Sequence, residues 1–186
     1  MDIRNSPYFI ESWQNSLIKL NDGRVLEGIK TRFNINNFSV HFTTDEKVQM
    51  FFPPELVKEL DIYEKTETKN IMYKFKTGFP KVDNLDQNSF YQVLSEGTIS
   101  LLKSIRKNLV VNKNDISGEV EKQFIFYENY YLFSNNKMIR LKKDKDFILK
   151  LVSAKKDKIE EFMKDHPTNF KNIADLVSLV NFYNAL

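Results

Sequence analysis

The sequence predicts an α+β protein in which a curved or partly closed antiparallel β-sheet carries short C-terminal helices packed on it. Three observations predict this class. Apolar and polar residues alternate over most of residues 1–141, which is typical of half-buried strands. Turn signals such as Asp22-Gly23 divide this stretch into short segments. After Leu141 the apolar period changes from two residues to about 3.6, which indicates helices.

Two parts of the chain follow from this change of period. We expect a β-rich body over residues 1–141 and a helical tail over residues 142–186 that docks on the body, the two forming one cooperative unit. At 186 residues the chain is long enough to bury about 70% of its unfolded surface. Short helices like those of the tail are unstable alone, so they must pack on the sheet or on each other.

The first strands form a β-meander over residues 16–52. Asp22-Gly23 is the strongest hairpin signal in the chain, because glycine readily adopts the positive φ of a tight turn. Further along, Phe38, Val40 and Phe42 alternate with polar residues and are expected to share one face of a strand.

One short helix is expected to interrupt the strands, over residues 54–60. Pro53-Pro54 cannot continue a central strand, whereas proline suits the first turn of a helix. Strand character returns at Ile62, and a second hairpin is expected around residues 95–98.

The sequence leaves two structures open beyond Leu102. Odd-numbered apolar positions over residues 99–111 fit a long strand, whereas Leu102, Ile105 and Leu109 also fit a helix. Residues 112–120 are polar, and we expect a disordered or boundary loop there.

The last strands and the helices have clearer signals. Three short strands are expected over residues 123–127, 130–134 and 137–141, the last two joined by a turn at Asn135-Asn136. Three helices are expected over residues 146–153, 155–165 and 172–185. Asn172 and Asp175 have the spacing of a capping box, which favours the start of the last helix at this point.

Composition excludes several classes of protein. The chain has no cysteine, which rules out disulfides, thiolate metal sites and cysteine nucleophiles. Its 28 basic and 25 acidic residues give a net charge of +3. Lysine dominates over arginine among the bases, so sequence-specific nucleic-acid recognition is not expected. No run of about 20 apolar residues is present, so no transmembrane segment is expected.

No motif of a known catalytic or cofactor site occurs in the sequence. His41 and His166 are far apart and lack the spacing of zinc ligands. The serines form no Gly-x-Ser-x-Gly elbow, and the five glycines form no phosphate loop. Acid pairs such as Glu160-Glu161 are interleaved with lysine, as on a solvated helix face. We therefore expect no cofactor, no metal site and no catalytic residue.

A group of lysines at the start of the tail is the strongest charge feature. The candidates for an anion-binding site are Lys142, Lys143, Lys145, Lys155, Lys156 and Lys158. Acids such as Asp144 and Asp157 lie between them, so ion pairs on a solvated helix face are the more common interpretation. The aromatic run from Phe124 to Phe133 has the composition of a stacking surface for bases or sugars, but it fits strand packing better.

Two segments carry a resemblance to a known group of proteins. The first has the pattern apolar, Asp-Gly, apolar, Gly over residues 17–29 and a later Pro54-Glu55-Leu56-Val57-Lys58. The second has Tyr131-Leu132-Phe133, then Leu141-Lys142-Lys143, and ends in Val180-Asn181-Phe182-Tyr183-Asn184. These segments are similar to uncharacterised, usually exported β-rich proteins of Bacteroidetes-type bacteria with a helical C-terminal tail. The resemblance implies export to the periplasm or cell surface and carries no known active residues.

The function expected from the sequence is a non-enzymatic binding or interaction protein of the bacterial cell envelope, with an unknown protein or envelope partner. An enzyme with an unrecognised site of acids, tyrosine and lysine stays open, and a pocket holding acids with perturbed pKa values would favour it. A binder of polyanions or anionic membranes through the tail lysines stays open too. A cytoplasmic location is compatible with residues 1–7, which lack the apolar segment of a signal peptide. A homodimer through exposed edge strands is compatible with the pattern as well.

Overall fold

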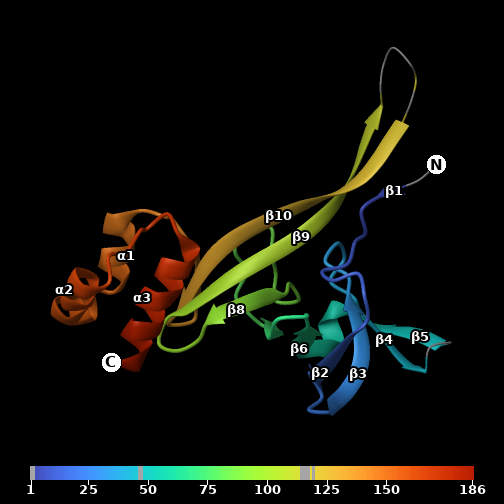
Figure 1. Ribbon diagram of the computed structural model, residues 1–186, viewed down its shortest axis with the longest axis horizontal. Coiled ribbons are helices and arrows are strands. Elements are labelled where there is room, and N and C mark those ends of the chain that lie inside the picture. The colour runs from blue at the N-terminus through green and yellow to red at the C-terminus, as the bar shows by residue number, and fades with distance from the viewer. Residues whose placement is uncertain (1–2, 46–47, 114–117, 119) are drawn as a thin grey trace. The chain divides into compact units, whose positions relative to one another are not determined.

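The computed structural model describes residues 3–45, 48–113, 118 and 120–186. Over these residues the chain is an α+β protein with an eleven-stranded, mostly antiparallel sheet that does not close, followed by three short helices (Figure 1). The predicted fold class is confirmed. The strand order is β1-β10-β9-β8-β7-β6-β2-β3-β4-β5, and β11 pairs with β10.

The chain divides into two compact units. Unit 1 holds Met1–Gln92 and Ser104–Glu128, and unit 2 holds Val93–Lys103 and Asn129–Leu186. The first strands all belong to unit 1: β1 (Ile3–Arg4), β2 (Gln14–Leu20), β3 (Val25–Phe33), β4 (Val40–Asp45), β5 (Val48–Phe52), β6 (Val57–Lys65) and β7 (Asn70–Lys76).

The later elements lie partly or wholly in unit 2. Three strands have residues in both units: β8 (Tyr91–Ser95), β9 (Ser100–Lys113) and β10 (Val120–Ser134). The last strand and the α-helices lie in unit 2: β11 (Lys137–Arg140), α1 (Lys145–Leu151), α2 (Lys156–Asp165) and α3 (Ile173–Ala185), with a 3-10 helix, Ser153–Lys155, between α1 and α2. No helix of the described residues is long and apolar enough to cross a membrane.

Local turn signals were reliable guides to the hairpins. β2 and β3 are joined at Asp22-Gly23, where Gly23 has a φ of 91° and its N–H donates to the Leu20 carbonyl. β10 and β11 are joined at Asn135 and Asn136, whose φ angles of 50° and 56° are those of a tight two-residue turn. Both predicted turns are confirmed.

The helix expected over residues 54–60 is wrong in most of its length. Only Pro54–Leu56 form a single 3-10 turn, and β6 begins at Val57. β6 lies between β2 and β7, and its pairing with β2 places Leu60 opposite Ile18. Both of these side chains are fully buried. Burial in a central strand therefore outweighs the helical propensity of this segment.

The long strands differ from the short ones expected. β9 is a strand over its whole length, which decides between the two structures left open beyond Leu102. β10 is continuous from Val120 to Ser134, where two separate strands were expected. Of the loop expected over residues 112–120, residues 114–117 and 119 lie outside the described residues, and the ends of the loop belong to β9 and β10.

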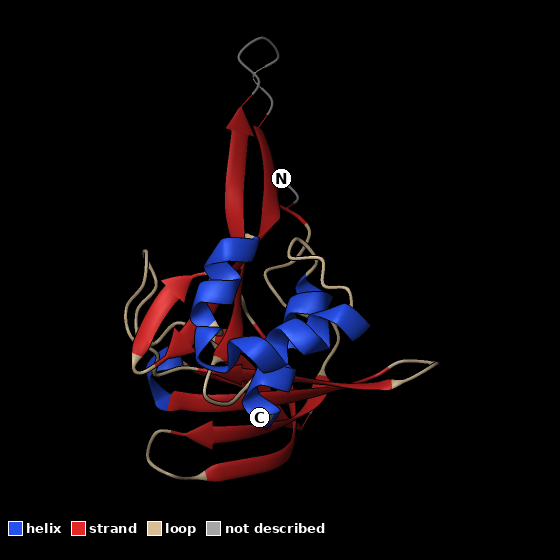
Figure 2. Cartoon of the chain, turned by 90° about the vertical axis from the view of Figure 1, so that its left-hand side faces the viewer, coloured by secondary structure: helices blue, strands red, loops and turns tan. Residues whose placement is uncertain are grey.

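The helices close the apolar core of unit 2, and they are the blue elements of Figure 2. Ile148, Ile159 and Leu176, one from each helix, are buried with Leu101 and Leu132 of the strands. The predicted docking face of the helices is therefore buried against strands of their own unit. A separate apolar core in unit 1 includes Ile18, Phe33, Val40, Leu60, Ile62, Phe75 and Ile105.

The start of α3 is capped differently from the expected capping box. The Asn172 side chain accepts the N–H of Ala174 at 2.8 Å, as an N-cap residue should. The Asp175 carboxylate instead accepts the N–H of Asn169 at 2.8 Å, and so it fixes the loop before the helix.

Candidate functional site

The sheet of unit 1 has one apolar face and one charged face. Ile18, Leu60 and Phe75 lie side by side across β2, β6 and β7 and face the core. Because side chains alternate along a strand, the residues between them lie on the opposite face. That opposite face carries the candidate site.

Nine side chains, three from each strand, form a regular array on this face, which we call the Asp61 array. Its central row, on β6, is Glu59, Asp61 and Tyr63. The register places these three residues opposite Lys19, Leu17 and Asn15 of β2 and opposite Lys76, Lys74 and Met72 of β7. Directly opposed side chains on one face contact each other. The array therefore mixes two acids, three lysines, an amide and a phenol with two apolar side chains, Leu17 and Met72.

Glu59 is the firmly paired acid of the array. The Lys19 Nζ lies 2.7 Å from the Glu59 Oε1, and the Lys76 Nζ lies 3.7 Å from the Oε2. Burial acts to raise the pKa of Glu59, but the hydrogen bond and charge of Lys19 outweigh it, so the pKa lies below its ordinary value. Glu59 is thus ionised at neutral pH and held in place.

Asp61 is the strained member of the array. It is only 7% exposed, and its Oδ1 is buried without a hydrogen-bond partner among the described residues. Burial, and next the negative charge of Glu59, raise the pKa of Asp61 above its ordinary value, against the opposing effect of Lys74. A buried polar atom without a partner costs roughly 1–3 kcal/mol. The Oδ1 lacks a donor, and because it is closed off from solvent, a ligand reaches it only if neighbouring side chains move.

A pocket of about 340 Å³ adjoins the array, lined by Asn15, Ser16, Leu17, Glu27, Gly28 and Tyr63. A β-bulge in β3 borders it. Ser16 pairs with Ile29 and Leu17 pairs with Glu27, so Gly28 between them has no partner on β2. Gly28 has a φ of 68°, and a side chain in its place would meet nothing within 4 Å. Gly28 and Tyr63 thus both line the pocket, and Gly28 has open space in front of it.

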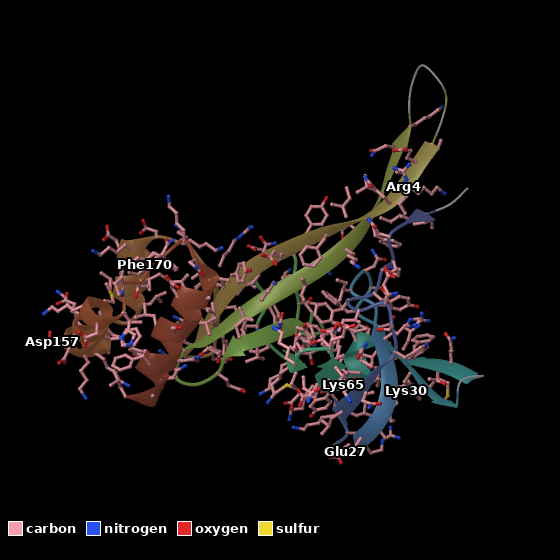
Figure 3. The ribbon with its side chains drawn as sticks, in the orientation of Figure 1. Arg4, Glu27, Lys30, Lys65, Asp157 and Phe170 are labelled. Atoms are coloured by element: carbon pink, nitrogen blue, oxygen red, sulfur yellow. The ribbon has the colours of Figure 1, made fainter. Side chains whose placement is uncertain are left out.

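Charged residues of β3 border the array on its far side. Leu17 and Asn15 of β2 lie opposite Glu27 and Lys30, both labelled in Figure 3. Acids and bases therefore continue to alternate beyond the pocket. Among the described residues, no group of three or more histidines and acids is placed to hold a metal ion.

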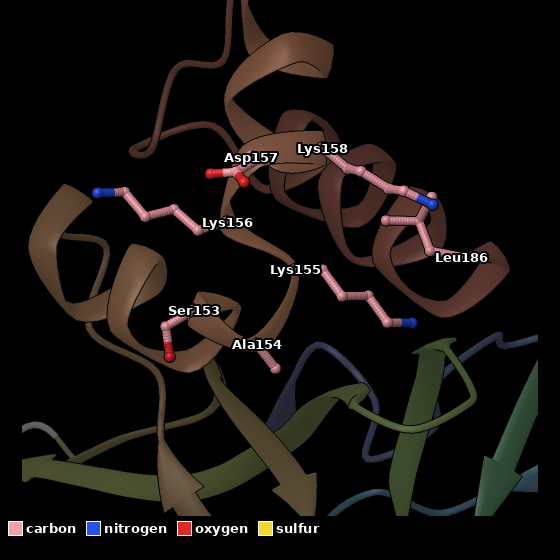
Figure 4. Close-up of a pocket in the computed structure, with 7 residues that line it drawn as sticks. All are labelled: Ser153, Ala154, Lys155, Lys156, Asp157, Lys158 and Leu186. Atoms are coloured by element: carbon pink, nitrogen blue, oxygen red, sulfur yellow. The ribbon is translucent and has the colours of Figure 1, made fainter.

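The tail lysines predicted as anion-binding candidates lie in unit 2 and separate into two sets. Lys142 and Lys143 precede α1, which begins at Lys145. The Lys143 Nζ lies 4.7 Å from the centre of the Tyr130 ring. The other three candidates, Lys155, Lys156 and Lys158, line a pocket of about 440 Å³ with Ser153, Ala154, Asp157 and Leu186 (Figure 4).

The ammonium groups of this second pocket do not converge. In Figure 4, Lys155 and Lys156 point in different directions, and Lys158 extends toward Leu186. The Lys155 Nζ donates to the Tyr183 carbonyl at 3.2 Å, and the Lys156 Nζ lies 3.6 Å from a Glu160 carboxylate oxygen. Two of the three lysines are thus already engaged, as on a solvated helix face. Anion binding by the six lysines stays a prediction.

The two histidines lie in different units. His41 of β4 contacts the Tyr8 ring and accepts or donates a 3.0 Å hydrogen bond at Ser39. Burial, and then the charge of Arg32, lower the pKa of His41. His166 follows α2 and stacks on Phe162. The geometry around each is that of side-chain packing.

Sequence reasoning missed the Asp61 array because it assigned part of β6 to a helix. One signal was present: Glu59, Asp61 and Tyr63 are spaced by two residues, with Leu60 and Ile62 between them. That alternation is typical of a strand with one polar face. Comparison with known proteins found no matching family model, no matching curated protein and no matching solved structure.

Proposed function

We propose that this chain is a non-enzymatic binding protein of the bacterial cell envelope and that it binds its ligand on the Asp61 array. The observation that carries the proposal is the 340 Å³ pocket lined by Tyr63, whose strand β6 also holds Asp61 with its buried, unpartnered Oδ1. Buried polar atoms are nearly always hydrogen-bonded in folded proteins, so one without a partner calls for an explanation. A ligand that displaces neighbouring side chains and gives the Oδ1 a donor is such an explanation.

The envelope setting rests on the resemblance of residues 17–29 and of the C-terminal segments to exported proteins of Bacteroidetes-type bacteria. Fractionation of the native cells tests this part. Recovery of the protein in the periplasmic or surface fraction supports the proposal. Recovery with a cytoplasmic marker enzyme contradicts it.

A specific observation favours a second function, an enzyme that uses the same array. The pKa of Asp61 is raised and that of Glu59 is lowered, although both carboxyls lie on one face of β6. Two acids with pKa values moved apart are the usual arrangement of a proton donor and a proton acceptor in an active site. Lys19 and Tyr63 complete the acid, lysine and tyrosine set.

An NMR titration of the full-length chain separates the two functions. Probes of four kinds are added: neutral disaccharides, inorganic phosphate, spermidine and a short uncharged peptide. Binding on the array shifts amide signals of β2, β6 and β7 and leaves the probe chemically unchanged. Conversion of a probe that is lost in Asp61→Asn supports the enzyme. If no probe shifts these amides, binding on the array is wrong.

A further inference from the structure

We propose that the ligand of the Asp61 array is a neutral saccharide, an inference that rests on the proposed function and specifies its ligand. Three features of the array and its pocket carry it: the balance of charges, the pairing of donors with acceptors, and an exposed aromatic ring at the pocket edge.

The charges of the array select against strongly charged ligands. Lys19, Lys74 and Lys76 surround Glu59 and Asp61, so a cation meets three ammonium groups and an anion meets two carboxylates. Like charges at short range are destabilising. Glu27 and Lys30 repeat the alternation on β3. A neutral ligand avoids both repulsions.

The hydrogen-bonding groups of the array suit hydroxyls. Carboxylates only accept and ammonium groups only donate, whereas a hydroxyl does both. A ring of hydroxyls in the pocket can therefore donate to a carboxylate such as that of Glu27, which lines it. The Asn15 side chain, which lines the pocket, offers an amide that both donates and accepts. Ligands with one kind of polar group would leave part of this set unpaired.

Tyr63 supplies the apolar part of the site. Its side chain is 46% exposed and lines the pocket with Leu17. An aromatic ring with a polar tip suits a ligand that has an apolar C–H face and polar edges, as a sugar ring has. The pocket volume of about 340 Å³ is at the small end of the range for ligand sites, which fits one or two sugar rings.

The test is titration of the full-length chain with maltose, lactose and cellobiose, followed by amide NMR and calorimetry. We expect at least one to shift the amides of Asn15, Leu17 and Tyr63 to saturation. Its Kd should change less than about two-fold between low and high salt, because a neutral ligand has no charge to be screened. Phosphate and spermidine should leave these amides unmoved.

Two pairs of variants separate the site from general effects. Tyr63→Ala should weaken saccharide binding roughly ten-fold, which corresponds to the loss of one aromatic contact. Tyr127→Ala is the matched control, because Tyr127 is also 46% exposed but lies on β10, and it should bind as the wild type does. Gly28→Asn should block the pocket, whereas Gly78→Asn, at another glycine of positive φ in open space, should not.

The outcomes separate this inference from the proposed function. Saturable shifts with a saccharide that survive Tyr127→Ala and are lost in Gly28→Asn support both. Shifts of the same amides by phosphate or spermidine alone overturn the saccharide inference and leave a binding site on the array. Equal weakening by Tyr63→Ala and Tyr127→Ala also overturns it, since binding would not then depend on the pocket.

Discussion

Replacing Asp61 by asparagine should make the protein more stable at neutral pH. The substitution keeps the size of the side chain and removes a buried charge whose Oδ1 has no partner and whose neighbour Glu59 is also negative. An unsatisfied buried acceptor costs roughly 1–3 kcal/mol, and a neutral amide recovers part of this cost. We expect a gain of about 1–2 kcal/mol in the free energy of unfolding, or roughly 2–8 °C in Tm for a chain of this size.

The pH dependence of this gain has a definite sign. The pKa of Asp61 in the folded protein is raised above its value in the unfolded chain. Its stabilising contribution is therefore complete below the unfolded pKa and is lost as the pH rises through the folded pKa. The advantage of Asp61→Asn should be absent in acid, appear as the wild-type carboxyl ionises and reach a plateau towards neutral pH.

Urea unfolding of both proteins at several pH values measures this difference, with equal m-values as the check that the same surface unfolds. Glu59→Gln is the matched control with the opposite sign. Glu59 has a lowered pKa and a 2.7 Å contact with Lys19, so its loss should cost about 1 kcal/mol at neutral pH after allowance for the partly exposed lysine. If Asp61→Asn lowers stability at neutral pH, Asp61 is not a strained group and the argument for a ligand fails.

Three further predictions concern unit 2. The Asn184 side chain donates to the Ile99 carbonyl at 2.8 Å and accepts the Ile99 N–H at 3.0 Å. Asn184→Ala should therefore lower the free energy of unfolding by about 2 kcal/mol, measured by thermal unfolding. Asn181→Ala, at an exposed position of α3, is the control and should change it little. A chain ending at Leu141 should aggregate or lose its cooperative unfolding transition in scanning calorimetry, because it exposes buried apolar side chains of β9 and β10. A soluble product that unfolds cooperatively would show that the helices are not needed to cover these side chains. If the tail lysines form a solvated helix face, Lys158→Gln should elute from a heparin column at the same salt concentration as the wild type. Elution at a clearly lower salt concentration would favour polyanion binding by these lysines.

Local signals allowed much of the fold to be predicted. The turns at Asp22-Gly23 and Asn135-Asn136 depend on the φ preferences of a few residues, and both are where the sequence places them. The helical segments of the tail were found because an apolar period of 3.6 belongs to the segment itself. β6 was missed because its strand state depends on pairing with β2 and β7, which come from distant parts of the sequence.

The same reason explains why the candidate site was missed. The pKa of Asp61 is raised first by burial of its carboxyl and next by the charge of Glu59, two residues away on β6. The burial depends on the strands that flank β6, and no spacing along the chain encodes that pairing. The Gly28 bulge likewise depends on how β3 pairs with β2.

A buried acid with an unpaired oxygen lowers the stability of the fold, so stability alone does not explain Asp61. Leucine or threonine at position 61 would fit the β-strand without leaving a buried charge unpaired. Leu17, opposite Asp61 on β2, shows that this face accepts apolar residues. Natural sequences depart from local consistency mainly at functional or strained positions. The array combines such a departure with a β-bulge and an open pocket, both of which also reduce regular packing. The proposed ligand would offset the cost of the buried acid and of the bulge when it binds, which is why we expect both at the binding site.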